Sequence, residues 1–467
     1  MRRALILLAT VALGGCDLAP HYIRPASPVP AQLPSGGTYP QLTDAPTTAP
    51  ADVVWHDFFT DPRLRSLIDL ALANNRDLRI AVANVAQARA QFASARANLF
   101  PTVSANAGAT FERQSQEAIF PGEPRRINAY QVDAGISSWE IDLFGRLRNQ
   151  SKEAFQTYLA NEDARNAAQV LLISEVASAW LTLASDQDML KVAKATTAAD
   201  LQTFELTKTK FRVGSASELD VRQAQTGYDA ARGQVASETA LVAQDINALQ
   251  LLTGAPPPVD TLPDGLPAAG ATLANLPVGL NSDVLLRRPD ISEAEHRLRA
   301  ANADIGAARA AFFPQISLTA TLGTLSGSLS GLFGGGNGTW TVAPQGTVPI
   351  FDFGKNAANL RYSKASRDLA VAQYEKAIQT GFKEVADALA QRGTIRAQIE
   401  AQTSLEGAAA AALRLSDLRY RTGSDQFLTV LDAQRTLYSA QQSLISVRLT
   451  EQSNMVELYR SLGGGLK

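Results

Sequence analysis

Four stretches of the chain alternate between apolar and polar residues, which is the pattern of strands with one apolar face. The apolar positions are Val103, Ala105, Ala107, Ala109 and Phe111 in the first stretch and Tyr130, Val132, Ala134 and Ile136 in the second. They are Ile316, Leu318, Ala320 and Leu322 in the third and Trp340, Val342, Val348 and Ile350 in a weaker fourth. Such alternation fits a half-buried strand and also a barrel strand that crosses an outer membrane. The connecting segments 112–126 and 323–338 are polar or Gly-rich, as loops would be.

Long helices are predicted after the second and fourth stretches. The chain has no proline between Pro124 and Pro256, and none after Pro349. Segments 145–214 and 354–423 each offer roughly 100 Å of helix at about 1.5 Å per residue. A packed seam is indicated by three- and four-residue steps between Ile173, Val176, Trp180 and Leu183. Shorter helices are expected before Pro101 and Pro314 and after each long helix.

The chain contains an internal duplication. Segment 74–101 resembles 287–314 at an offset of 213 residues, and segment 211–225 resembles 420–434 at an offset of 209. Each half therefore reads as helix, Phe-Pro, strand, loop, strand, Phe-Gly, long helix, Arg-x-Gly-Ser turn and helix. Because several matches occur in the same order, the two halves are predicted to be repeats of one unit.

The N-terminus has the pattern of a bacterial lipoprotein signal. Arg2 and Arg3 precede an apolar run from Ala4 to Leu13, and Gly14-Gly15-Cys16 follows. The run is too short for a permanent membrane helix. Cleavage would leave Cys16 as an acylated N-terminus, with an ordinary secretory signal as the alternative. Cys16 is the only cysteine, which excludes an intramolecular disulfide.

These patterns divide the chain into five segments. They are a signal peptide at 1–15, a Pro-rich lipidated strap at 16–54, a first repeat at 55–253, a joint at 254–286 and a second repeat at 287–467. The first repeat would hold a β-hairpin at 102–140 and a tip turn at 212–215. The second would hold a hairpin at 315–351 and a tip turn at 421–424.

Composition narrows the classes of function. The 43 basic and 45 acidic residues nearly cancel, which argues against a nucleic-acid partner. Three histidines, His21, His56 and His296, lack the spacing of metal ligands. No nucleophile motif or phosphate-binding loop is visible. We therefore expect no enzyme, no metal site and no cofactor beyond a covalent lipid on Cys16.

Four strands cannot close a membrane barrel, because the smallest such barrels have about eight strands. A lipid-exposed open edge would leave backbone groups without hydrogen-bond partners. If the strands lie in a membrane, several copies must share one barrel, and three copies would supply twelve strands.

This organisation resembles the outer-membrane factor (TolC/OprM-like) family and, within it, the NodT-type outer-membrane efflux lipoproteins. The likeness covers essentially the whole mature chain. It is carried by Cys16 with "APHYIRP", by "WHDFFTDPRLRSLIDLALANNRDLRIA", Phe100-Pro101, "WEIDLFGRLRN", "RRPDI", Phe313-Pro314, "PIFDFGK", "RYRTGS" and "LDAQRTLYSAQQSLI". The resemblance implies an α+β membrane protein, a homotrimer with a twelve-stranded barrel that continues as an α-helical barrel through the periplasm.

The function implied by the resemblance is the exit duct of a tripartite efflux pump. The expected partners are a periplasmic adaptor, an inner-membrane transporter of the resistance-nodulation-division type and outer-membrane lipid. One alternative is the duct of an ABC-type or metal-ion exporter, and a remote one is a structural coiled-coil lipoprotein that conducts nothing. Asp17 follows Cys16, and in enteric bacteria an Asp there favours retention in the inner membrane.

Three groups of residues are candidate sites. In each of two tip turns, Gly can end one helix and Ser can cap the next. The first turn contains Arg212, Gly214 and Ser215, and the second contains Arg421, Gly423 and Ser424. The resemblance adds docking of the adaptor at these tips. It also implies a periplasmic aperture at Leu413, Asp417, Arg419 and Arg421. The alternative interpretation is that these residues form a solvated, charged end of the helix.

The third group marks the strand-to-helix exits, Phe144-Gly145 and Phe353-Gly354. Gly is expected to relieve the sharp change of backbone direction there. The neighbouring aromatic ring is expected to pack at the lower rim of the barrel.

Overall fold

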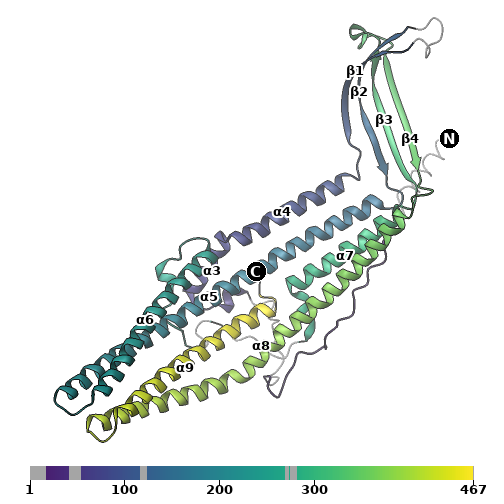
Figure 1. Cartoon of the computed structure of the whole chain (residues 1–467). Coiled ribbons are helices and arrows are strands. Elements are labelled where there is room, and N and C mark those ends of the chain that lie inside the picture. Colours follow the sequence, from purple (N-terminus) through teal and green to yellow (C-terminus); the bar gives the residue numbers. More distant parts are fainter. Residues whose placement is uncertain (1–16, 41–53, 116–123, 269–272, 274–280, 466–467) are drawn as a thin grey trace. The chain divides into compact units, whose positions relative to one another are not determined.

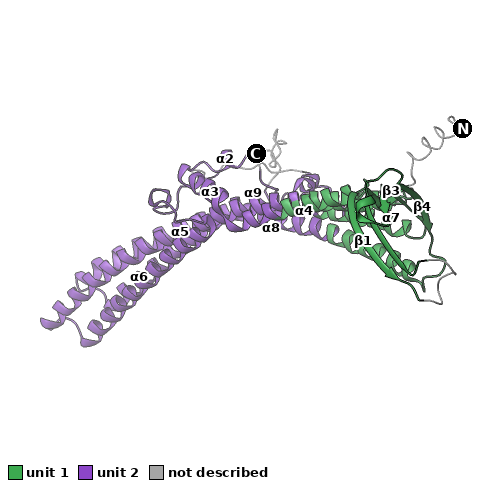
Figure 2. Cartoon of the chain, turned by 90° about the horizontal axis from the view of Figure 1, so that it is seen from above, with its two compact units in different colours: residues 1–25, 84–161, 294–374 green, residues 26–83, 162–293, 375–467 purple. Residues whose placement is uncertain are grey.

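The computed structural model describes residues 17–40, 54–115, 124–268, 273 and 281–465. The predicted signal peptide and Cys16 lie outside the described residues. The chain forms two compact units, and each takes segments from both repeats (Figure 2). Unit 1 comprises residues up to Pro25, Asn84–Asn161 and Ala294–Tyr374, and unit 2 comprises Ala26–Ala83, Glu162–Glu293 and Glu375–Lys467. The division into repeats and the division into units therefore cut the chain differently.

Unit 1 contains a four-stranded antiparallel sheet (Figure 1). Its strands, in spatial order, are β1 (Val103–Arg113), β2 (Arg126–Ile141), β3 (Gln315–Ser326) and β4 (Gly338–Thr347). The two hairpins are joined by pairing of β2 with β3, for example Ala134 opposite Leu322. Strands β1 and β4 are the edges, and each pairs with one strand among the described residues. Pro344 lies in edge strand β4, the position where a missing backbone donor is tolerated.

The strand predictions need three corrections. Val348 and Ile350 lie outside β4, which ends at Thr347, because Pro349 cannot donate to the ladder. Residues 112–113, 126, 323–326 and 338, assigned to loops, belong to strands. In β2 the regular alternation breaks at a bulge between Ile136 and Trp139, where Ser138 has a φ of 52°.

The helix predictions are confirmed. Helices α5 (Arg146–Arg212) and α8 (Lys355–Arg421) each contain 67 residues. The shorter helices are α4 (Arg76–Ala97), α6 (Glu218–Thr253), α7 (Pro289–Ala310) and α9 (Phe427–Ser461). Two small helices, α2 (Trp55–Phe58) and α3 (Pro62–Asn74), and three 3-10 turns complete the described elements.

The core of unit 2 contains the seam predicted on α5. Ile173, Val176, Trp180 and Leu183 are all 0% exposed. The indole Nε1 of Trp180 donates to the Thr261 carbonyl at 3.0 Å, so the inter-repeat joint covers this seam. The most apolar 18-residue window of α5 has a mean hydropathy of 1.5 and is 56% buried, in keeping with a packed helix.

A buried arginine ties the start of α7 to two other helices of unit 2. Arg288 is 4% exposed, and its Nη1 donates to the Ser461 carbonyl on α9 at 2.7 Å. Its Nη2 donates to Asp290 and to Glu384 of α8, both at 2.8 Å. Because a buried charge is costly unless it is paired, these contacts offset the cost of burying the Arg288 guanidinium.

The Pro-rich strap has neither helix nor named strand over residues 17–40. In unit 1, Arg24 forms an ion pair with Glu295 of α7 at 2.8 Å, and the Tyr22 hydroxyl donates to the same carboxylate at 3.1 Å. In unit 2, the Ala31 carbonyl accepts a bond from the Ser282 amide at 3.0 Å. The strap therefore contacts both units along its length.

Candidate functional site

The first strand-to-helix exit is packed inside unit 1. Gly145 has a φ of 77°, a conformation that side chains with a Cβ rarely adopt, and α5 begins at the next residue. Phe144 stacks on Phe313 with ring centroids 4.8 Å apart and planes at 20°. The Asp142 carboxylate accepts a hydrogen bond from the backbone amide of Arg148 at 2.9 Å. This bond satisfies an N–H group of the first helical turn that has no partner within the helix.

The second exit has the same left-handed glycine as the first, but it differs in the backbone before that glycine and in its environment. Gly354 has a φ of 83°, and Phe353 also has a positive φ of 52°. Asp352 accepts the amides of Gly354 and Asn356, each at 2.9 Å. Phe353 is 90% exposed and contacts only the ring of Phe351 among the described aromatic residues, at 4.5 Å. Among the described residues, Phe144 therefore packs on an aromatic ring of the other repeat, whereas Phe353 contacts only a ring two residues away.

Both tip turns in unit 2 end a long helix in the same way. Gly214 and Gly423 have φ values of 79° and 78°. The Ser215 amide donates to the Lys210 carbonyl and the Ser424 amide to the Arg419 carbonyl, each at 2.8 Å. This six-to-one hydrogen bond, with a left-handed glycine before it, is a Schellman motif.

The prediction that Ser215 and Ser424 cap the following helices is wrong. The N-cap of α6 is Ser217, which exchanges hydrogen bonds with Asp220 in a capping box. The N-cap of α9 is Gln426, which makes no side-chain cap. Ser215 closes the preceding helix instead, since its hydroxyl donates to the Lys210 carbonyl at 3.1 Å.

The four predicted aperture residues separate into two groups. Leu413, Asp417 and Arg421 line one hollow of about 250 Å³ between α5, α8 and α9. Within it, Arg421 Nε lies 2.7 Å from Asp417 Oδ2. Arg419 is not in this group, because its guanidinium binds Asp425 at 2.7 and 2.9 Å.

A second set of contacts, missed by the sequence analysis, links α5 to the end of α8. Lys210 Nζ donates to the backbone carbonyl of Tyr420 at 3.0 Å, and it lies 3.8 Å from the centroid of the Tyr420 ring. Thr207 Oγ1 lies 3.5 Å from the Tyr420 hydroxyl. Tyr420 is 7% exposed and belongs to a small apolar core with Phe427 and Val430, against which Leu413 packs. These contacts hold the α8–α9 tip against α5.

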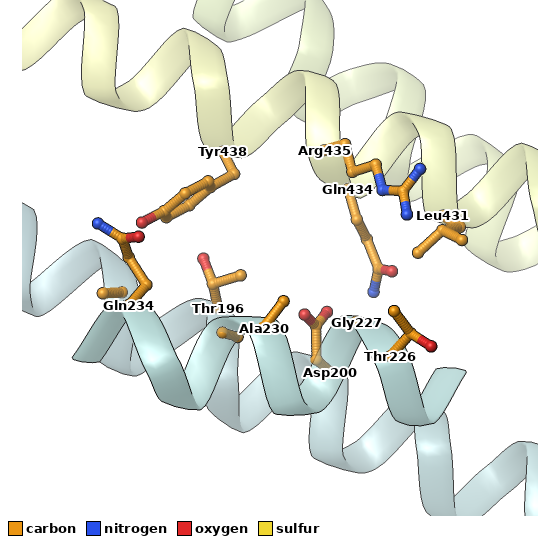
Figure 3. A pocket seen from close by; sticks show the side chains of 12 residues that line it. Thr196, Asp200, Thr226, Gly227, Ala230, Gln234, Leu431, Gln434, Arg435 and Tyr438 are labelled. Atoms are coloured by element: carbon orange, nitrogen blue, oxygen red, sulfur yellow. The ribbon is translucent and has the colours of Figure 1, made fainter. Parts of the chain in front are cut away.

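A groove of about 220 Å³ lies further from the tips, between the α5–α6 pair and α9. In Figure 3, Asp200 from α5 and Gln434 from α9 point toward one another across it. One carboxylate oxygen of Asp200 and the hydroxyl of Tyr438 are buried without a partner among the described protein atoms. Burial raises the pKa of Asp200 to about 6.

An acidic pair joins α5 to α6. Burial, followed by repulsion from Asp186 and a hydrogen bond with it, raises the pKa of Asp245 to about 7. The pKa of Asp186 is also raised, first by burial, with Glu238 adding repulsion. Because two nearby carboxylates repel each other, the pair keeps a proton to a higher pH than an isolated carboxyl group would.

The described residues contain no group of three His, Cys, Asp or Glu side chains that could hold a metal ion. His296 contacts Gln156 at 2.7 Å, and His56 lies 3.8 Å from Asp69. The predicted lipidation site, Cys16, lies outside the described residues.

Comparison with known proteins agrees with this architecture. The family model of outer membrane efflux proteins matches residues 67–255 and 280–464. The chain is 47% identical to the probable efflux pump outer membrane protein TtgC of Pseudomonas putida, over 100% of this chain and 96% of that protein. It is 41% identical to the outer membrane protein OprJ of Pseudomonas aeruginosa, over 98% and 95%.

Solved structures share the fold. The open-state outer membrane channel MtrE of Neisseria gonorrhoeae superposes with a TM-score of 0.86 at 38% identity, covering 97% of this chain and 99% of that one. CusC, whose structures concern transmembrane channel formation, gives a TM-score of 0.86 at 37% identity, with 96% and 100% covered.

The four-stranded sheet, the two long helices and the similarity to these relatives identify the chain as an outer-membrane channel. The chain belongs to the outer membrane efflux protein family. The predicted fold class, the α+β fold of trimeric outer-membrane channels with four strands per chain, is confirmed. The predicted function as the exit duct of an efflux pump and the location in the outer membrane, extending into the periplasm, are also confirmed.

Proposed function

We propose that three copies of this chain close a twelve-stranded barrel and pass small organic molecules outward without catalysis. The single observation that carries this assembly is the sheet, whose edge strands β1 and β4 have one neighbour each among the described residues. Open edges are not stable in lipid, so each β4 would pair with the β1 of another copy.

The proposed cargo is drugs and apolar solvents. Relatives that are 46–47% identical to this chain are named toluene, solvent and antibiotic efflux pump outer membrane proteins. A periplasmic adaptor and an inner-membrane transporter of the resistance-nodulation-division type would supply the cargo and the energy. The duct itself needs only a wide lumen and an aperture.

The experiment that tests this function is cross-linking of the tagged chain in its own cells, followed by identification of what co-purifies. Recovery of an adaptor and a proton-driven transporter is expected, and deletion of the gene should raise susceptibility to toluene and to antibiotics. Recovery of an ABC transporter instead would assign the duct to a different export system. Efficient cross-linking with no partner would contradict an efflux role.

The adaptor is proposed to dock on the tip turns around Gly214 and Gly423. Support comes from the exposed apolar side chains beside them, since Val213 is 73% and Leu219 is 65% exposed. Exposed apolar groups at a rigid turn are suited to contact another protein. Val213→Asp should abolish capture of the adaptor while the protein stays in the outer membrane, whereas Val259→Asp, at an 84% exposed site outside the tips, should not.

The hollow lined by Leu413, Asp417 and Arg421 is proposed to be part of the periplasmic aperture. It lies beside the Lys210–Tyr420 contact that holds the α8–α9 tip against α5. Outward movement of that tip would break this contact, so the closed state is proposed to depend on it. Arg419, bound to Asp425, would stabilise the turn itself.

Cys16 is proposed to carry the lipid anchor after removal of residues 1–15. The support is the sequence pattern alone. Labelled palmitate should enter the protein in growing cells, and Cys16→Ser should prevent this. A Cys16→Ser form that still carried label would contradict the assignment.

A further inference from the structure

The groove between the α5–α6 pair and α9 in unit 2 contains polar atoms that passage through the duct does not use (Figure 3). Its volume of about 220 Å³ corresponds to roughly seven water molecules at about 30 Å³ each. Small residues of α5 and α6, including Ala193, Gly227 and Ala231, line one side, and Leu431 of α9 lines the other. The groove can therefore hold a small molecule with an apolar body.

Two glutamines of the lining have fixed amide orientations. Gln434 Nε2 donates to Thr203 Oγ1 at 3.3 Å, since that hydroxyl already donates to the Ala199 carbonyl at 3.0 Å. Gln234 Nε2 donates to the Glu238 carboxylate at 2.6 Å. Each bond uses the amide nitrogen, so each glutamine keeps a carbonyl oxygen that can only accept a hydrogen bond.

Asp200 is the acidic residue of the lining. Its Oδ1 is buried and has no hydrogen-bond partner among the described protein atoms. Its Oδ2 lies 3.8 Å from the position of a Cβ added at Gly227, so the groove has room for a group beside the carboxylate. Burial raises the pKa of Asp200 to about 6, and the side chain is therefore mostly ionised near neutral pH. A buried carboxylate oxygen without a donor is costly, and a bound cation would offset that cost.

Two residues of α9 complete the lining on the side of Gln434. The Tyr438 hydroxyl is buried and has no partner among the described protein atoms, and burial, followed by repulsion from Glu238, raises its pKa. Arg435 is the basic residue of the lining, and it is exposed to solvent. The buried polar groups are therefore acidic or neutral. They favour a ligand that carries a positive charge and donates hydrogen bonds.

We propose that this groove binds a primary ammonium group carried on a small apolar body, as in an aralkylamine. The ammonium has three N–H donors, and it binds the Asp200 carboxylate and the Gln434 carbonyl oxygen. The apolar body lies against Leu431 and the Tyr438 ring. The ligand contacts α5, α6 and α9 together.

The groove is linked to the aperture hollow through Gln434, which lines both. Its hydrogen bond to Thr203 joins α9 to α5 at this boundary. A ligand that bridges Asp200 and Gln434 strengthens the same connection. This second step rests on the proposed aperture, in which the α8–α9 tip moves away from α5 on opening. The bound amine then favours the closed state.

Isothermal titration calorimetry of the full-length protein in detergent, near neutral pH, tests the binding. 2-Phenylethylamine should bind with a dissociation constant of about 1 mM or lower. 2-Phenylethanol has the same body without the charge and should bind at least about tenfold more weakly, because charge-assisted hydrogen bonds are the stronger ones. Titration into empty micelles corrects for partition of the probes into detergent. Absence of amine binding, or equal affinity for the alcohol, would overturn the assignment.

An anionic probe tests the role of Arg435. 3-Phenylpropionate carries a carboxylate on a similar body, and we expect it not to bind. Tighter binding of this probe than of the amine would show that the groove selects anions through Arg435, and the ammonium assignment would be wrong.

Variants locate the binding. Asp200→Asn keeps the shape of the side chain without its charge and should weaken amine binding at least about tenfold. Gly227→Ala should also weaken it, because the new methyl group takes the space beside the carboxylate. That methyl lies 3.6 Å from Leu431 Cδ1, an ordinary contact, so the variant should fold. Gly233→Ala on the same helix, where a Cβ meets nothing within 4 Å, should bind as the native protein does. Native affinity in Asp200→Asn, or equal loss in Gly233→Ala, would refute the site.

Single-channel recording tests the effect on the aperture. In Lys210→Met, whose aperture is expected to open more readily, 2-phenylethylamine should lower the conductance. It should have no effect in the double variant with Asp200→Asn. Unchanged conductance despite binding in the calorimeter would refute the coupling to the closed state. If Lys210→Met conducts like the native protein, the proposed aperture is wrong instead, and the calorimetry still decides whether the groove binds amines.

Discussion

Phe144, which follows β2, stacks on Phe313, which precedes β3, with their ring centroids 4.8 Å apart. Phe353 and Phe100 are the equivalents of these residues in the other repeat, after β4 and before β1. Both are largely solvent-exposed, at 90% and 63%. Because β4 and β1 are the free edges of the sheet, the same stacking can form only between two copies of the chain.

We therefore expect Phe353 of one copy to lie against Phe100 of the next. The double variant Phe100→Cys with Phe353→Cys should give covalent dimers and trimers with a short bis-maleimide. Each single variant controls for reaction with other thiols. Phe144→Cys with Phe313→Cys should link only within a chain. A double variant that stays monomeric while the native trimer forms would contradict this pairing.

Because Asp186 and Asp245 lie together, we predict that the free energy of unfolding falls as pH rises through about 7. The pKa of Asp245 is raised from 3.8 to about 7 in the folded chain, so the folded state binds more protons than the unfolded state between these values. The contribution is present at low pH and is lost as pH rises through the folded pKa. Asp200, with a pKa of about 6, acts in the same direction.

Thermal unfolding in detergent at pH 5, 6.5 and 8 measures this dependence. The native protein should unfold at a lower temperature at pH 8 than at pH 6.5, and Asp245→Asn should flatten the difference. Asp229→Asn on the same helix is the control, because that side chain is 50% exposed and paired with Arg232. An unchanged pH profile in Asp245→Asn would refute the shared proton.

Removal of Asp417 or Lys210 should loosen the closed aperture. Asp417→Ala frees Arg421, and Lys210→Met removes the hydrogen bond to the Tyr420 carbonyl and the cation over its ring. Vancomycin susceptibility should rise and single-channel conductance should increase, with the larger effect for Lys210→Met because it joins two helices. Asp229→Ala is the matched control, and native values of both readouts would remove these residues from the aperture.

Arg288→Met should be among the most destabilising single changes in unit 2. It leaves Glu384, Asp290 and the Ser461 carbonyl without their shared donor. Loss of one partner of a buried ion pair costs about 3–5 kcal/mol. Arg396→Met on α8 should cost less than about 0.5 kcal/mol, since Arg396 is 90% exposed. Denaturant titration in detergent compares the two free energies of unfolding.

Duplication made much of the fold predictable from the sequence. The two Phe-Gly and two Arg-x-Gly-Ser motifs bracket α5 and α8, and both helices begin and end within two residues of these glycines. The alternating pattern of the fourth stretch led to a wrong strand assignment at Val348 and Ile350, because Pro349 ends the ladder of backbone hydrogen bonds there. The cap prediction was wrong at Ser215 because Ser217, two residues further on, caps α6, and at Ser424 because α9 begins only after Gln426.

The site was less predictable, since it depends on which faces of different helices meet. Asp186 continues the Trp180–Leu183 seam by three residues, a signal that could have marked it as partly buried. Asp200 and Lys210 have no such local signal. Their environments come from α9 and from Tyr420 of α8, each more than 200 residues away in the chain.

The free edges of the sheet have a genetic consequence. A copy that cannot pair with its neighbour's sheet also inactivates the intact copies in the same trimer, because all three copies are needed to close the barrel. In a cell that expresses both alleles, a change at β1 or β4 that permits one contact and blocks the other should act dominantly. A truncation that ends the chain before β1, and so removes both hairpins, should be recessive.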